Sequence, residues 1–183
     1  MPFSGLRLLA EPGKVMTPRA TTEALVDAVV ERIGDRPAVV ADVGTGSGAV
    51  AVAVAARAPN ARVWATDTSC AAVALARANV CRQGLGDRIS VVHRDLLEGI
   101  PEQLDLVAAN LPYLPAALRP HRPELTAEPP DAVFAGGDGL GPYRRLIDAC
   151  RTALRPDGLL AIQLHGRILL REAAELGRLE LAA

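Results

Sequence analysis

The sequence has few aromatic, cysteine and histidine residues and a single lysine, Lys14. Aromatic residues make up 3% of the 183 positions, so the core has to be built from Ala, Val and Leu. The three cysteines and three histidines are scattered without CxxC spacing, which gives no basis for a metal site and favours thiols in a reducing compartment. No run of Lys or Arg occurs and the formal net charge is −1, which argues against nucleic acid as a partner.

Long apolar runs are also missing. No stretch reaches membrane-spanning length, and the N-terminus lacks a charged region followed by a long apolar one. We therefore expect a cytoplasmic protein with no membrane partner.

Short apolar strands alternate with helices, which predicts an α/β fold with a doubly wound, mostly parallel sheet. The expected strands cover residues 38–43, 62–66, 89–93, 104–109 and 159–164. The expected helices cover residues 21–33, the Ala/Val-rich stretch up to Arg57, and residues 69–79, 143–154 and 168–176. Thr21 or Thr22 is expected to cap the first helix and Gly34 to end it. Residues 1–20 are predicted to form an N-terminal arm, and residues 21–183 a single domain. The Pro- and Gly-rich segment 111–141 is too long for a plain connection and predicts an active-site loop.

A glycine-rich loop follows the first strand of the domain. It consists of Asp42, Val43, Gly44, Thr45, Gly46, Ser47 and Gly48. Glycines there let the backbone approach a nucleotide-type ligand, and Asp67, at the end of the next strand, can accept both hydroxyls of a ribose. The rival is a dinucleotide site, but its fingerprint is G-x-G-x-x-G, whereas this spacing is G-x-G-x-G. The carboxylate of Asp42 suits a ligand with an ammonium group and no phosphate, which favours S-adenosyl-L-methionine.

Asp95 lies just past the third strand. Its carboxylate can accept the exocyclic amine of adenine while Leu96 packs against the ring. A plain turn cap is an equal alternative for Asp95.

Asn110, Leu111, Pro112 and Tyr113 follow the fourth strand, which we expect to lie next to the first. In doubly wound sheets, ligands bind where the carboxyl ends of such strands meet. The side-chain carbonyl of Asn110 and the backbone carbonyl of Leu111 match the two N–H bonds of a primary amide or amine. Pro112 restricts the backbone of Leu111, and Tyr113 offers a flat face for stacking. These four residues are the predicted catalytic residues.

With these residues placed, the chain resembles the protein-(glutamine-N5) methyltransferases that modify peptide-chain release factors, a family of class I S-adenosylmethionine-dependent enzymes. Further matching pieces are Thr17-Pro18-Arg19, Thr22-Glu23, Arg94 to Leu97, Glu128-Pro129, Gly136 to Leu140 and Tyr143-Arg144-Arg145. The resemblance implies that Gly44 to Gly48, Asp67, Leu96 and Asn110 contact the cofactor. It also implies that Asn110 to Tyr113 bind the glutamine amide of a release factor.

Three departures from this family bear on the expectation. Leu111 stands where the family usually has proline, and a backbone carbonyl survives that change. The Asn-Leu-Pro-Tyr form also resembles ribosomal RNA adenine dimethyltransferases. No counterpart of the family's N-terminal helical domain is expected here. The sheet is also expected to lack the final strand pair, so that a partner chain or a second copy completes its edge.

Three hypotheses follow from the sequence. The first is an N-methyltransferase acting on a protein glutamine. The second is an N-methyltransferase acting on a nucleic-acid adenine or a small metabolite. The third is a catalytically idle, cofactor-binding subunit of a complex.

Overall fold

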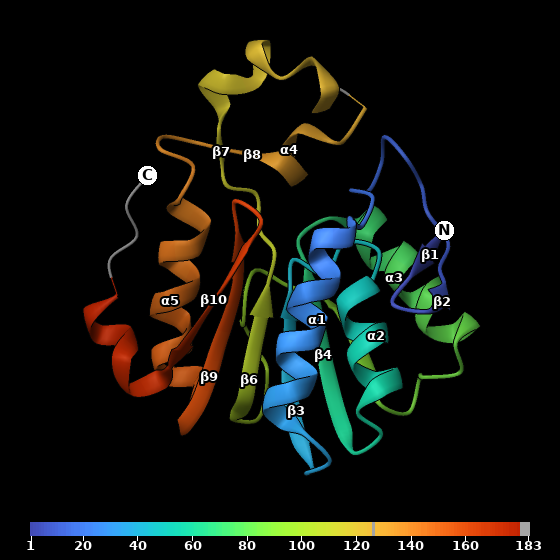
Figure 1. Ribbon diagram of the computed structural model, residues 1–183, viewed down its shortest axis with the longest axis vertical. Helices are drawn as coiled ribbons and strands as arrows, with labels where there is room; N and C mark the ends of the chain where they lie inside the picture. Colours follow the sequence, from blue (N-terminus) through green and yellow to red (C-terminus); the bar gives the residue numbers. More distant parts are fainter. Residues whose placement is uncertain (126, 180–183) are drawn as a thin grey trace.

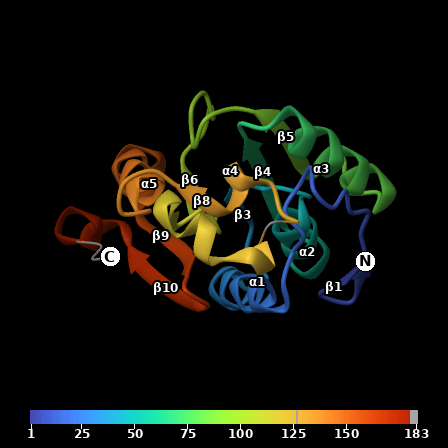
Figure 2. The ribbon, with the colours of Figure 1, turned by 90° about the horizontal axis from the view of Figure 1, so that it is seen from above.

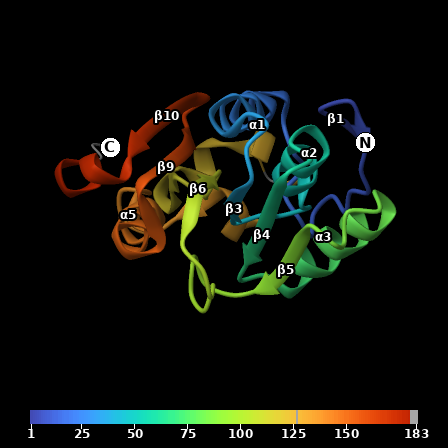
Figure 3. The same cartoon turned by 90° about the horizontal axis from the view of Figure 1, so that it is seen from below.

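A central sheet with helices on both faces organises the chain, of which the computed structural model describes residues 1–125 and 127–179 (Figure 1). Its strands are β3 (Ala38–Val43), β4 (Ala61–Asp67), β5 (Ile89–His93), β6 (Leu104–Ala109), β9 (Leu154–Leu164) and β10 (Arg167–Glu172). The long helices are α1 (Ala20–Ile33), α2 (Ala49–Arg57), α3 (Cys70–Arg82) and α5 (Gly141–Ala153). The strand order is β10-β9-β6-β3-β4-β5, as Figure 3 shows from below, and only the β10–β9 pair is antiparallel within this sheet. The predicted doubly wound α/β fold is confirmed.

Shorter elements lie at the two ends of the chain and above the sheet. The strands β1 (Pro2–Phe3) and β2 (Leu6–Arg7) form an N-terminal hairpin. The long segment after β6 contains β7 (Leu114–Pro115), β8 (Phe134–Ala135), α4 (Pro130–Val133) and the 3-10 helices Ala116–His121 and Pro123–Leu125. Figure 1 shows this segment above the carboxyl ends of the strands. A last 3-10 helix, Ala173–Arg178, follows β10.

Alternate residues of the central strands enter two separate hydrophobic clusters. Val40 and Leu106 belong to the cluster that includes residues of α1 and α2, whereas Val39 and Val107 belong to the cluster that includes residues of α5. Successive side chains of a strand point to opposite faces of the sheet, so both faces are buried. Figure 2 shows α1 and α2 on one side of the sheet and α5 on the other. Small aliphatic side chains fill both layers.

The register of three strands places their carboxyl ends at the same level. Val43, the last residue of β3, lies opposite Thr66 of β4 and opposite Ala109 of β6. The residues that follow β3 and β6 therefore emerge side by side, with the end of β4 next to them. The predicted adjacency of the first and fourth strands is confirmed.

The N-terminal residues pack against the same core. Phe3 and Leu8 are 2% and 3% exposed and belong to the cluster that includes α1 and α2. Asn79 of α3 also accepts from the backbone N–H of Leu9 at 2.7 Å. The predicted arm, residues 1–20, thus packs into the same hydrophobic core as α1 and α2.

The helix predicted at residues 168–176 is wrong. Residues Arg167–Glu172 form β10, which pairs with β9 through the turn at His165 and Gly166. Both turn residues have positive φ (50° and 75°), as a type I′ hairpin turn requires. Ile168 and Leu170 pack on one cluster and Leu169 on the other, as the alternation of a strand requires. In the sequence alone, this short run of apolar residues fits a strand and a short helix equally well. The sheet therefore has one more strand, beside β9, than the sequence predicted.

Two predicted element ends also differ from the structure. The N-cap of α1 is Arg19, without a side-chain cap, so neither Thr21 nor Thr22 caps that helix. β9 begins at Leu154, directly after α5, and not at Leu159. Leu154 pairs with Leu104 before the register shifts, and this extra pairing lengthens the strand.

Gly48 allows α2 and α3 to approach each other closely. A Cβ at Gly48 would lie 3.1 Å from both the Cα and the Cβ of Ala76, and the φ of Gly48 is +78°.

Gly84 has a similar φ, +67°, with nothing within 4 Å of an added Cβ. Gly84→Ala should cost about 1 kcal/mol of unfolding free energy through the backbone alone. Gly48→Ala should cost roughly 1–3 kcal/mol more because it also overpacks the helices. Urea denaturation measures both, and equal losses would contradict this packing role.

Candidate active site

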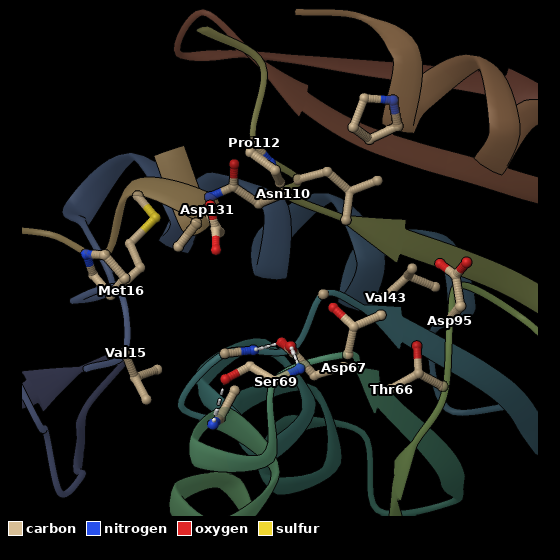
Figure 4. Close-up of a pocket in the computed structure, with 18 of the residues that line it drawn as sticks. Val15, Met16, Val43, Thr66, Asp67, Ser69, Asp95, Asn110, Pro112 and Asp131 are labelled. Atoms are coloured by element: carbon tan, nitrogen blue, oxygen red, sulfur yellow. Dashed lines mark hydrogen bonds between the residues drawn. The ribbon is translucent and has the colours of Figure 1, made fainter. Parts of the chain in front are cut away.

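A cavity of about 660 Å³ lies at the carboxyl ends of β3, β4, β5 and β6 (Figure 4). In Figure 4, Asp67 and Ser69 lie on one wall, and Asn110, Pro112 and Asp131 lie on the opposite wall. The predicted site residues on its walls are Gly44, Gly46, Asp67, Asp95, Leu96, Asn110, Leu111 and Pro112. The fold thus brings residues from four separate stretches of sequence to one cavity.

The glycine loop is held against the end of β4. The backbone N–H groups of Gly44 and Thr45 both donate to the Thr66 carbonyl at 2.9 Å. Gly44 has a φ of +69°, and a Cβ there would lie 2.6 Å from Cδ2 of Leu111. The left-handed backbone therefore favours glycine at this position, and any larger residue would also displace the side chain of Leu111.

Asp42 lies behind the cavity wall and shapes the loop. Its carboxylate, 3% exposed, accepts from the Thr45 hydroxyl at 2.5 Å and from the Ala51 N–H at 3.0 Å. Burial raises the pKa of Asp42 from 3.8 to about 6, against the lowering effect of these two hydrogen bonds, and the nearby Asp67 raises it further. Thr45, Ser47 and Gly48 also lie outside the cavity lining. Direct contact of these four residues with a ligand stays a prediction.

Asp67 joins the loop to the start of α3. One carboxylate oxygen accepts from the Gly46 N–H at 2.9 Å and the other from the Ser69 N–H at 2.8 Å. Ser69 in turn caps α3 by accepting from Ala72 at 3.3 Å. Each carboxylate oxygen keeps a further lone pair, and two such oxygens side by side suit two neighbouring hydroxyls.

Asp95 forms an ion pair with Arg145 of α5, and both residues line the cavity. Among the described residues the carboxylate pairs with Arg145 and accepts from no backbone N–H, which does not support the turn cap. The contact of Asp95 with an adenine amine stays a prediction. The pair is partly exposed, with Arg145 at 62% and Asp95 at 35%, so its contribution to stability is small. Leu96 has a positive φ of 48°, a strained value for leucine, which places its side chain in the cavity wall.

The backbone of Leu111 is fixed by the buried side chain of Tyr143. The Leu111 N–H donates to the Tyr143 hydroxyl at 3.0 Å, and the Leu111 carbonyl lies 3.0 Å from the same hydroxyl. This hydroxyl also donates to the Gln163 carbonyl at 2.6 Å. Since a phenol has one proton, the shorter contact to Gln163 takes it. Burial raises the pKa of Tyr143 far above its usual range.

The side chain of Asn110 contacts α1. Its amide nitrogen donates to the hydroxyl of Thr22 at 3.3 Å, and Thr22 is 5% exposed. Tyr113, by contrast, lies outside the cavity lining, and its ring meets His165 edge-on at a centroid distance of 4.8 Å. Stacking of an acceptor on Tyr113 stays a prediction.

The N-terminal arm and the long segment 111–141 meet at the cavity. Glu128 accepts from the backbone N–H of Thr17 at 3.1 Å and lies 4.0 Å from the guanidinium of Arg19. Met16 and Asp131, which come from these two segments, both line the cavity (Figure 4). Two of the matching sequence pieces, 17–19 and 128–129, are therefore spatial neighbours.

Several residues at the site carry no role in the sequence-based interpretation. They are Lys14, Val15, Met16, Thr66, Asp131 and Arg145 on the cavity wall, and Thr22 and Tyr143 behind it. Thr22, Tyr143 and Arg145 lie in matching pieces, but no local pattern indicates their partners. Their roles depend on contacts between distant parts of the chain.

Comparison with known proteins identifies the family of this chain. Residues 19–118 match the family model described as the methyltransferase small domain. The chain belongs to this methyltransferase family. It is 42% identical over 153 residues to the release factor glutamine methyltransferase of Moorella thermoacetica, covering 82% of this chain and 54% of that protein. It is 38% identical over 177 residues to the protein of the same name from Deinococcus radiodurans, covering 95% and 62%. The chain thus spans little more than half the length of these relatives.

Solved structures of methyltransferases share the fold. The ribosomal protein L11 methylase of Lactobacillus delbrueckii subsp. bulgaricus has a TM-score of 0.58 and 25% identity over 81% of this chain and 62% of its own. The T. thermophilus 16S rRNA N2 G1207 methyltransferase has a TM-score of 0.60 at 20% identity, over 80% and 34%. The resemblance to class I methyltransferases is confirmed.

No helix within residues 1–125 and 127–179 combines the length and the apolar character needed to cross a bilayer. In that same part of the methyltransferase chain, the His, Cys, Asp and Glu side chains form no group of three or more that could hold a metal ion.

The raised pKa of Asp42 makes stability depend on pH. Because the folded pKa of about 6 exceeds the usual 3.8, the folded chain binds more protons than the unfolded chain between these values. Stability therefore falls as pH rises through this window, by about 3 kcal/mol in total. Asp42→Asn cannot titrate at this position, so it should not show this loss. Urea unfolding of both proteins from pH 4 to pH 7 measures the difference, and a constant difference would contradict the assignment.

Proposed function

We propose that this chain is a cytoplasmic S-adenosylmethionine-dependent N-methyltransferase that modifies the side-chain amide of a glutamine in a peptide-chain release factor. The observation that carries the proposal is the position of Asn110 and Leu111 in the wall of the cavity formed beside the glycine loop. Two relatives that are 42% and 38% identical to this chain are named release factor glutamine methyltransferases, which supports this acceptor.

The cavity suits S-adenosylmethionine in size and chemistry. A volume of about 660 Å³ lies within the range of cofactor sites. Gly44 and Gly46 present backbone to the cavity, Asp67 presents oxygens for the ribose hydroxyls, and Leu96 offers an apolar wall for adenine. Thr66 also lines the cavity, and its buried hydroxyl has no hydrogen-bond partner among residues 1–125 and 127–179. When bound, the cofactor supplies an electrophilic methyl group.

The acceptor would bind between the two oxygens that follow β6. The amide nitrogen of Asn110 donates to the Thr22 hydroxyl, which leaves Asn110 Oδ1 as an acceptor for one N–H of the substrate amide. The Tyr143 proton goes to Gln163, so the Leu111 carbonyl retains lone pairs for the second N–H. An amide nitrogen is a weak nucleophile, and two aligned acceptors orient it and stabilise the positive charge that develops on it. The transfer would leave the methyl group on the nitrogen, release S-adenosylhomocysteine as the leaving group, and pass one amide proton to water.

Asn110→Ala should reduce methyl transfer about 100-fold, because it removes one of the two acceptors at the nitrogen. The affinity for S-adenosylmethionine should fall by about tenfold or less, the effect of one hydrogen bond. Asn60→Ala is the matched control, since exposed Asn60 bonds to the Asp35 carbonyl outside the cavity lining. Transfer of tritiated methyl to a purified release factor measures the rate, and calorimetry measures the affinity.

The same assay separates the competing hypotheses. Label that appears in a glutamine of the release factor supports the proposal. Label found only in RNA or in small molecules would assign a different acceptor. Binding of the methyl donor without turnover on any of these acceptors would make the chain an idle, cofactor-binding subunit.

A further inference from the structure

The side chain of Thr22 lies next to Asn110 but outside the cavity lining. We propose that Thr22 is a positioning residue for the methyl transfer: its hydroxyl binds the amide nitrogen of Asn110 and restrains this side chain in the position from which Oδ1 reaches the acceptor. This inference rests on the proposed function, since it assigns a task to Asn110 as an acceptor of the substrate N–H.

The backbone on either side of Asn110 is already fixed. Ala109 is the last residue of β6 and pairs with Val43. Leu111 is held through its N–H by Tyr143. The freedom that remains at Asn110 is rotation of its side chain, and the last of these rotations decides which end of the amide enters the cavity.

The two ends of the amide have opposite effects on the acceptor. With Oδ1 toward the cavity, Asn110 accepts an N–H of the substrate. With Nδ2 toward the cavity, two N–H donors face each other, and the substrate loses one partner. The observed bond from Nδ2 to the Thr22 hydroxyl, at 3.3 Å, corresponds to the first arrangement and restrains rotation of the side chain. A hydroxyl can also donate to Oδ1, so the N–H of the bound substrate, which needs an acceptor, selects the end of the amide that faces it.

Thr22 is suited to this task by its place on α1. The residue is 5% exposed, and its backbone N–H donates to the Arg19 carbonyl at 2.8 Å, so the helix fixes its Cα. A threonine in a helix has two common χ1 rotamers, and the bond with Asn110 is made in the one observed here. A residue that only filled the core at this position would not need an oxygen, and valine would serve equally well.

Three variants separate positioning from packing. Thr22→Val keeps the shape and removes the oxygen, whereas Thr22→Ser keeps the oxygen and removes a methyl group. Thr21→Val places the same β-branched side chain at the adjacent, exposed position of α1 and controls for helix propensity. Thermal melts confirm that each variant is folded before its activity is compared.

The kinetic readout is kcat for the release factor, compared with the affinity for S-adenosylmethionine. Thr22→Val should lower kcat about tenfold, the factor that corresponds to one hydrogen bond, and should change the cofactor affinity by less than about twofold. Thr22→Ser should recover most of the rate, and Thr21→Val should match the wild type. A folded Thr22→Val protein with the wild-type kcat would overturn the inference.

A second readout does not depend on the acceptor. The chain contains three asparagines, so a protein labelled with ¹⁵N-asparagine has three side-chain amide pairs in its NMR spectrum. Asn110→Ala identifies the pair of Asn110 by its disappearance. Thr22→Val should shift this pair, and Thr22→Ser should restore it. If the wild type fails to methylate a release factor, the proposed function fails alone. An Asn110 pair that does not move in Thr22→Val would refute the positioning role alone.

Discussion

The parallel pairing of β3 with β6 is the constraint on which the rest of the site depends. Val43 lies opposite Ala109, so the glycine loop and the Asn110 motif leave the sheet at the same level. Their contact is direct, because the absence of a Cβ at Gly44 makes room for Leu111. The cofactor loop and the proposed acceptor site are thus set by one strand pair, and the distance between them is a property of the sheet.

Buried hydrogen bonds behind the cavity wall keep this arrangement in place. Asp42 ties the glycine loop to the first turn of α2, and Tyr143 ties Leu111 to the end of β9. Thr22 holds Asn110 from α1. Burial raises the pKa of Asp42, so at this residue the ionised carboxylate fixes the loop geometry while it costs folding stability. The surface that faces a ligand is therefore supported from several elements at once.

The sequence predicted the strands at 38–43, 89–93 and 104–109 to the residue, because each is a short apolar run bounded by polar or turn-forming residues. It also predicted eight residues on the cavity wall, since those follow strand ends. It missed β10, whose apolar residues 168–170 fit a helix or a strand until the hairpin turn is known. Thr22 and Tyr143 could not be found because their partners lie 88 and 32 residues away, and no local pattern encodes such contacts.

The central claim is that Asn110 Oδ1 and the Leu111 carbonyl converge on one nitrogen next to the transferable methyl. A crystal structure with S-adenosylhomocysteine and a glutamine-containing release-factor peptide tests it most directly. We expect both N–H bonds of the glutamine amide to end on these two oxygens, at about 3 Å, with the nitrogen pointing at the sulfur. An amide bound elsewhere, or a Leu111 carbonyl that faces only Tyr143, would contradict it.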